Sequence, residues 1–142
     1  MLYFSRTKYE KVKDFTQDDI KDKVLLESLI QQETDRIFES DKARKGRSRD
    51  QVYAMVQQGK VAEVYLKETG RFEFADIKWH DLINNQGEYC EVKAYDVNDW
   101  TATSVVRDLQ RYRTESWCKS TWYYLFQYRN GTYKLLAVLR IK

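Results

Sequence analysis

Three charged residues near the middle of the chain, Asp81, Glu91 and Lys93, have the types and the spacing to bind a metal ion and activate water. Side chains alternate between the two faces of a strand, so a strand over residues 88–95 places Glu91 and Lys93 on the same face. Carboxylate oxygens are the ligands that Mg²⁺ and Mn²⁺ prefer. An ammonium group beside such an ion can orient or help deprotonate a water molecule and offset the charge of a phosphate. These residue types therefore predict hydrolysis of a phosphodiester.

The contribution of Asp81 depends on the turn between two predicted strands, residues 78–83 and 88–95. A connection of three or five residues places Asp81 on the face of Glu91, whereas one of two or four residues turns it away. The turn sequence Asn84-Asn-Gln-Gly87 is compatible with both, and Gly87 suits a bulged connection of odd length. If Asp81 faces away, Asp76 is the alternative acid.

Glu63 is a further acidic candidate, because it falls on the apolar stripe of a helix predicted over residues 49–68. A carboxylate there is unfavourable unless it is paired or bound to a metal. Glu63 is therefore expected either to bind or support the metal, or to lie at the edge of the stripe and reach water or a lysine. The other members of the stripe are Val52, Val56, Gly59 and Leu66.

The remaining elements predict a mixed α/β domain. A helix is expected to begin near Thr16, and another near Thr101 or Thr103. Residues 72–74 have the alternation of a strand, and a loop is expected over residues 41–50. Two long strands, residues 120–128 and 132–141, flank an Asn-Gly pair that is typical of a hairpin.

The segment Trp79-His-Asp81-Leu-Ile, followed by a turn and by Tyr89-Cys-Glu91-Val-Lys93-Ala, resembles the core of the PD-(D/E)XK nucleases, the restriction-endonuclease-like superfamily. His80 stands where the family name has proline. The upstream Gly59-Lys-Val-Ala-Glu63-Val-Tyr-Leu66 resembles the helix that precedes this core in many members and often supplies another acidic ligand. The resemblance covers about residues 48–140 and leaves the first forty or so residues unmatched.

The resemblance implies a central mixed β-sheet flanked by helices and a metal-dependent endonuclease that cleaves DNA with Mg²⁺ or Mn²⁺. It assigns Asp81 and Glu91 as metal ligands, Glu63 as a supporting ligand, and Lys93 as the catalytic base or charge stabiliser. We expect one nuclease-like domain over residues 1–142, with a helical extension at residues 1–40 and a catalytic core at residues 48–142. A homodimer through residues 1–40 would add the contacts that so small a protein needs to hold duplex DNA.

Two polar groups are candidate DNA contacts, one in the basic loop and one on the third predicted helix. Arginine and lysine there can bind phosphates, although both groups also suit a solvated surface. These candidates are Arg44, Lys45, Arg47, Arg49, Arg107, Gln110 and Arg111.

Composition excludes several classes of protein. The chain has 142 residues, and its mean hydropathy of −0.76 and lack of long apolar runs argue against a membrane protein. Two cysteines, Cys90 and Cys118, do not make a disulfide framework, and the N-terminal residues have no apolar signal-peptide core, so a cytoplasmic location is expected. The net charge of +3 permits a nucleic-acid partner without requiring one. The alternatives to an enzyme are an inactive nucleic-acid-binding or regulatory module of the same fold and a protein-interaction domain.

Overall fold

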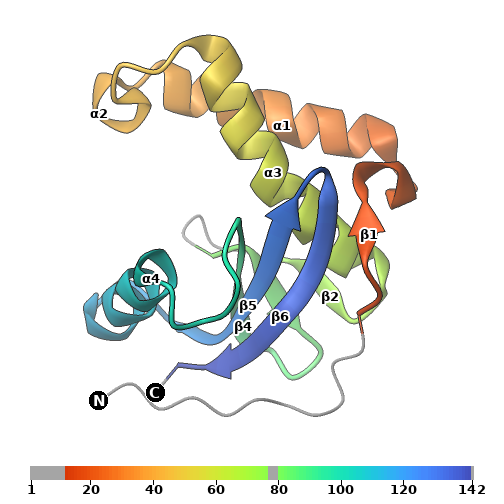
Figure 1. Ribbon diagram of the computed structural model, residues 1–142, viewed down its shortest axis with the longest axis vertical. Helices are drawn as coiled ribbons and strands as arrows, with labels where there is room; N and C mark the ends of the chain where they lie inside the picture. The colour runs from red at the N-terminus through yellow and green to blue at the C-terminus, as the bar shows by residue number, and fades with distance from the viewer. Residues whose placement is uncertain (1–11, 77–79, 142) are drawn as a thin grey trace.

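The computed structural model describes residues 12–76 and 80–141 (Figure 1). Its elements follow the predicted order of helices and strands, and the mixed α/β class is confirmed. In chain order they are β1 (Phe15–Thr16), the 3₁₀ turn η1 (Gln17–Asp19), α1 (Lys23–Phe38), α2 (Asp41–Arg44), α3 (Arg49–Glu68), β2 (Phe72–Phe74), β3 (Leu82–Asn84), β4 (Tyr89–Tyr95), α4 (Thr103–Thr114), β5 (Ser120–Arg129) and β6 (Thr132–Arg140).

The six strands form one mixed sheet in the order β1-β6-β5-β4-β3-β2. The central pair, β4 and β5, is parallel, and every other neighbouring pair is antiparallel. A parallel pair requires a crossover, and the segment containing α4 provides it between β4 and β5. The predicted central mixed sheet is therefore present.

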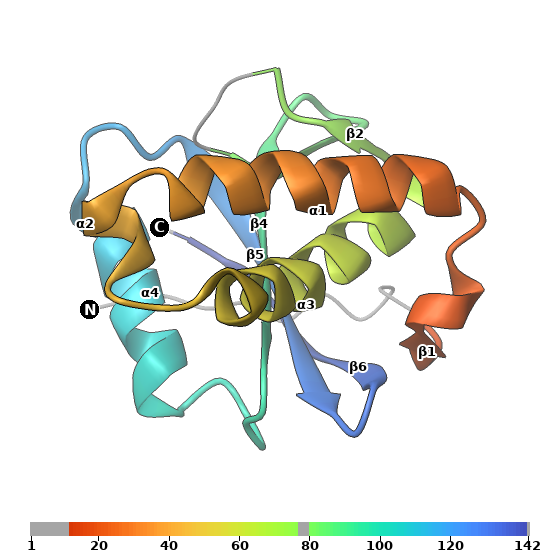
Figure 2. The same ribbon diagram turned by 90° about the horizontal axis from the view of Figure 1, so that it is seen from above.

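The helices cover the two faces of the sheet separately (Figures 1 and 2). α3 packs on one face with α1 lying along it, and α4 packs on the other. The strands supply both cores by alternation: in β5, Tyr124 and Phe126 belong to the core under α3, whereas Tyr123 and Leu125 belong to the core under α4. The aromatic residues of this strand thus mainly pack in the core, as expected.

The N-terminal helix begins later than the sequence suggested. Thr16 does act as a cap, but for η1, where its side chain accepts a hydrogen bond from Asp18 and Asp19 completes a capping box. The backbone is then extended at Ile20, and Asp22 caps α1 by accepting the amide of Leu25 at 2.9 Å. A second N-cap downstream of the first therefore moved the start of the helix to Lys23.

The basic segment expected as a loop contains the short helix α2. Ser40 caps it by accepting the amide of Ala43 at 3.2 Å, and Lys45 ends it in the left-handed conformation with φ of 54°. Ser48 then caps α3 with a capping box completed by Gln51, in agreement with the prediction of a cap at this position.

Residues 15–38 share a core with the sheet. Phe15 stacks on Tyr133 of β6 with 4.9 Å between ring centroids, and Leu26 and Ile30 of α1 are buried in the same cluster as α3. Among residues 12–76 and 80–141, no helix is both long and apolar enough to cross a membrane.

Candidate active site

The turn between β3 and β4 places Asp81 on the same side of the sheet as Glu91. Leu82 pairs with Cys90 and Ile83 with Tyr89, so the connection beyond Asn84 has three residues. The Asn84 amide donates to the Glu88 carbonyl at 3.0 Å, and Gly87 has a φ of +77° that suits a bulged turn. Continuing this register by one residue places Asp81 opposite Glu91. This is the arrangement that the sequence analysis expected for a connection with an odd number of residues.

The Asp81 and Glu91 side chains meet at this position. They hydrogen-bond to each other, and Asp81 Oδ2 also accepts the amide of Val92 at 2.8 Å. Glu91 Oε1 accepts the hydroxyl of Ser120 at 2.8 Å and lies 2.8 Å from His80 Nδ1. Each carboxyl group therefore has one oxygen, Oδ2 or Oε1, held by the protein.

The environment of Glu91 favours its protonated form. The residue is 4% exposed, and burial followed by the negative charge of Asp81 raises its pKa to about 8. The Ser120 hydroxyl and the Lys93 ammonium act in the opposite direction without reversing the shift. Two carboxyl groups in such contact are most stable when they share a proton or a cation.

Glu63 of α3 is a second buried acid beside Asp81. Burial, followed by the charge of Asp81, raises its pKa to about 8, although Lys60 pairs with it at 3.3 Å between Nζ and Oε1. Glu63 therefore pairs with a lysine, as one alternative of the sequence analysis has it, but it is buried rather than at the edge of the stripe, and its role as a metal ligand stays a prediction. Burial tends to lower the pKa of Lys60, but Glu63, Asp81 and Glu33 together raise it, so Lys60 stays protonated.

Lys93 points into the same region from the α4 side of the sheet. Burial tends to lower its pKa, but nearby acidic groups, led by Tyr95 and Asp108, outweigh that effect and raise it. Its Nζ lies 5.9 Å from the ring centroid of Tyr112, and no described carboxylate is close enough to form an ion pair with it. Lys93 is thus a half-buried, protonated amine that lines the same cleft as Asp81 and Glu63.

Two clefts meet at these charged residues. One has a volume of about 480 Å³ and extends along α3 and β4 past Lys93, and the other has about 500 Å³ and extends towards Arg36 and Asp76. The residues that line both are Glu33, Lys60, Glu63 and Asp81. Asp81 and Glu63 therefore face both clefts, whereas Glu91 is buried next to Asp81 and lines neither of them.

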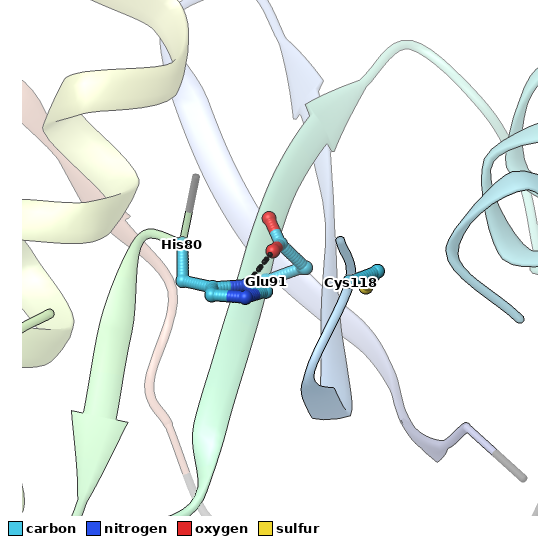
Figure 3. A group of neighbouring side chains, drawn as sticks. All are labelled: His80, Glu91 and Cys118. Carbon is cyan, nitrogen blue, oxygen red and sulfur yellow. Dashed lines mark hydrogen bonds and ion pairs between the residues drawn. The ribbon is translucent and has the colours of Figure 1, made fainter. Parts of the chain in front are cut away.

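His80, Glu91 and Cys118 form a group whose potential ligand atoms all lie within 4.8 Å of one another (Figure 3). The imidazole and the Glu91 carboxyl point towards each other, and Cys118 comes from the segment that precedes β5. The Ser120 hydroxyl lies 2.7 Å from His80 Nδ1 and 2.8 Å from Glu91 Oε1, and it also hydrogen-bonds the Cys118 side chain. The three side chains have the ligand types and spacing that could hold a metal ion, and each of them also hydrogen-bonds the Ser120 hydroxyl.

Asp76, the alternative acid, lies at the far end of the second cleft. It is exposed, and its Oδ1 accepts the Tyr89 hydroxyl at 2.8 Å. Asp81 contacts Glu91 instead, so the geometry favours Asp81 as the partner acid.

The candidate DNA contacts lie outside the clefts. None of the seven residues lines either of them among the described positions. Arg44 lies over the Phe38 ring at 4.7 Å, and Arg49 pairs with Asp35, so both guanidinium groups anchor the basic segment to α1. The remaining five, of which Arg47 alone is half-buried and the others are exposed, are Lys45, Arg47, Arg107, Gln110 and Arg111.

Sequence reasoning missed three groups that surround the site. Lys60 could have been found, because it precedes Glu63 by three positions on a helix and pairs of that spacing face each other. No local pattern indicated Glu33 of α1 or Tyr112 of α4, which approach from distant parts of the chain. No family model, no curated protein and no solved structure matches this chain.

Proposed function

We propose that this protein is a metal-dependent nuclease with a restriction-endonuclease-like fold that hydrolyses phosphodiester bonds in DNA. The observation that carries the proposal is the hydrogen-bonded pair of Asp81 and Glu91, of which Asp81 lines both clefts, with the protonated Lys93 lining one of them. A sheet that brings two acids and an amine together in this way matches the chemistry that their spacing predicts.

The donor set fits a hard divalent cation. Apart from the hydrogen bond within the pair, no described group donates to Asp81 Oδ1 or Glu91 Oε2, whereas the other oxygen of each carboxyl is held by the protein. A bound cation would compete with the proton that the pair favours, because both reduce the repulsion between the two carboxyl groups. Asp81 and Glu91 would hold Mg²⁺ or Mn²⁺, with Glu63 as the supporting acid. When bound, the ion would lower the pKa of a water molecule and polarise a phosphoryl oxygen.

Lys93 acts in this proposal as a charge stabiliser and not as a base. Its raised pKa keeps the amine protonated at neutral pH, so it can donate hydrogen bonds to a phosphate oxygen or orient the attacking water. Its burial strengthens that electrostatic effect, because a charge in a site with little water interacts over a lower effective dielectric constant. Lys60, paired with Glu63, adds a second positive charge to the wall of both clefts.

A polymer substrate suits the shape of the site. The two clefts share Asp81 and Glu63 and continue in different directions, so a nucleic-acid backbone can pass the acids with a neighbouring phosphate on each side. Arg36 at one end and Lys93 at the other offer positive charge to such phosphates.

Cleavage of plasmid and oligonucleotide DNA with Mg²⁺ or Mn²⁺ tests the proposal. We expect the wild type to cut and Asp81→Asn and Lys93→Ala each to lose about 100-fold or more in rate, because each removes a group that acts on the reacting phosphate. Asp14→Asn and Lys134→Ala are matched controls, since both residues are exposed, and they should cut as the wild type does.

Two outcomes would reject the assignment. Full activity in both Asp81→Asn and Lys93→Ala would place the chemistry elsewhere. Salt-sensitive DNA binding without cleavage in either metal would instead indicate an inactive binding module of the same fold. Light scattering of the protein tests the proposed homodimer, and a monomer at working concentration would remove it.

A further inference from the structure

We infer that His80 is a positioning residue that holds Glu91 so that one defined carboxylate oxygen is presented to the divalent cation. This inference rests on the proposed function, because it assigns a role around the same metal site. It also gives a reason for a histidine at the position before Asp81.

The imidazole of His80 is fixed from both sides. The amide of Lys119 donates to Nε2 at 3.2 Å, so Nε2 carries the lone pair and the ring proton resides on Nδ1. The ring stacks on Tyr89 with 4.7 Å between centroids, and Trp117 lies 6.3 Å away. The His80 side chain is 0% exposed, so the ring has no room to turn to another orientation.

The proton on Nδ1 faces two acceptors, Glu91 Oε1 and the Ser120 hydroxyl oxygen, which lies 2.7 Å from Nδ1. Nδ1 lies 2.8 Å from Oε1, and the Ser120 hydroxyl donates to the same oxygen at 2.8 Å. Both hydrogen bonds therefore hold Oε1, and Oε2 is left for the cation that Asp81 would share. Residues that orient a metal ligand through hydrogen bonds are important for binding: their removal typically lowers metal affinity or activity by about 10- to 100-fold.

The positioning role depends on where the side chain at residue 80 places its N–H donor, and not on the size of that side chain. Asparagine places its amide N–H where His80 has Nδ1, whereas the longer glutamine places its N–H near the position of Nε2. A merely structural role would favour glutamine, which is closer to histidine in length. A positioning role favours asparagine.

Mn²⁺ binding without DNA tests the inference, with free Mn²⁺ followed by electron paramagnetic resonance. We expect His80→Asn to bind Mn²⁺ within about 3-fold of the wild type, and His80→Gln and His80→Ala to bind about 10- to 100-fold more weakly. In cleavage assays the two weak binders should need correspondingly more Mn²⁺ for half-maximal rate. Circular dichroism melts should show that the Asn and Gln variants are both folded.

Asp81→Asn separates this inference from the proposed function. If Asp81→Asn loses Mn²⁺ binding and His80→Gln binds as tightly as His80→Asn, the positioning role is wrong and the metal site stands. If Asp81→Asn binds Mn²⁺ as the wild type does, the metal site itself is wrong. Ser120→Ala removes the second donor on Oε1 and should also weaken Mn²⁺ binding, which keeps the test valid if a His80 variant does not fold.

Discussion

At the scale of single residues, the site contains two carboxyl groups whose ionised forms are disfavoured by burial. Glu63 and Glu91 both have a pKa of about 8, caused first by burial and then by Asp81. In the unfolded chain these groups ionise near pH 4.5, so between pH 6.5 and 8 the folded protein binds protons that the unfolded chain does not. Folding stability must therefore fall as pH rises through this window.

The free energy of unfolding of the metal-free protein should fall between pH 6.5 and pH 8 by up to about 2 kcal/mol per carboxyl group. Burial lowers the pKa of His80 below its usual 6.5, so the unfolded chain holds this proton more tightly than the folded protein does, and His80 offsets a small part of the fall. Glu63→Gln should reduce the pH dependence, as measured by urea unfolding in EDTA at the two pH values. The exposed Glu73→Gln is the control, and a wild-type stability that does not change over this window would contradict the assigned burial.

At the scale of elements, α3 both builds a core and supplies the site. Its buried residues include Val52, Val61 and Leu66, and the same helix presents Lys60 and Glu63 to the clefts. Because Glu63 lies on the apolar stripe of α3, the packing of this helix buries it close to Asp81. The packing of α3 therefore determines the position of Glu63.

Gly59→Ala should stabilise the protein by about 0.5–1 kcal/mol, because a glycine inside a helix costs backbone entropy and a Cβ there meets no atom within 4 Å. Thermal melting should show a rise of about 2–4 °C per kcal/mol. Gly70→Ala is the informative comparison, since Gly70 has a φ of +86° beyond the end of α3 and alanine there is strained. A fall in melting temperature for Gly59→Ala would show that α3 is packed more tightly at this point than the structure has it.

At the scale of the whole molecule, the proposed function makes the arrangement of surface arginines decide how DNA would approach the site. Arg107 is exposed on α4, and Arg111, one helical turn later, lies 5.7 Å from the Trp117 ring. The spacing of four places both on the same side of the helix. We predict that this side contacts phosphates, whereas Arg44 and Arg49 mainly hold the basic segment to α1.

Arg107→Ala should weaken DNA binding severalfold and reduce the slope of log affinity against log salt by about 1, as loss of a single phosphate contact requires. The measurement is fluorescence anisotropy of a labelled duplex in EDTA, at several salt concentrations. Arg113→Ala removes an equally exposed arginine from another side of α4 and should leave the slope unchanged. Equal effects of the two variants would show that DNA does not approach this side of the helix.

Local pattern was sufficient for much of the fold and part of the site. Periodicity located α3 and its apolar stripe, the Asn130-Gly131 pair marked the β5–β6 hairpin, and turn residues separated β3 from β4. The start of α1 was wrong because two capping residues lie close together, and both the short α2 and the short β1 carry too little pattern to be detected. Short elements depend on the neighbours they pack against, which a sequence does not display.

The sequence by itself determined that Glu91 and Lys93 share a face of β4, because strand alternation is a local property of the backbone. Only the tertiary structure decided that Asp81 joins them, since a change of one residue in the turn would have reversed its direction. The same holds for the groups around the pair: Lys60, His80 and Ser120 come from α3, the loop before β3 and the start of β5. Their meeting depends on how the helices and strands pack, because the contacts join positions up to forty residues apart in the chain.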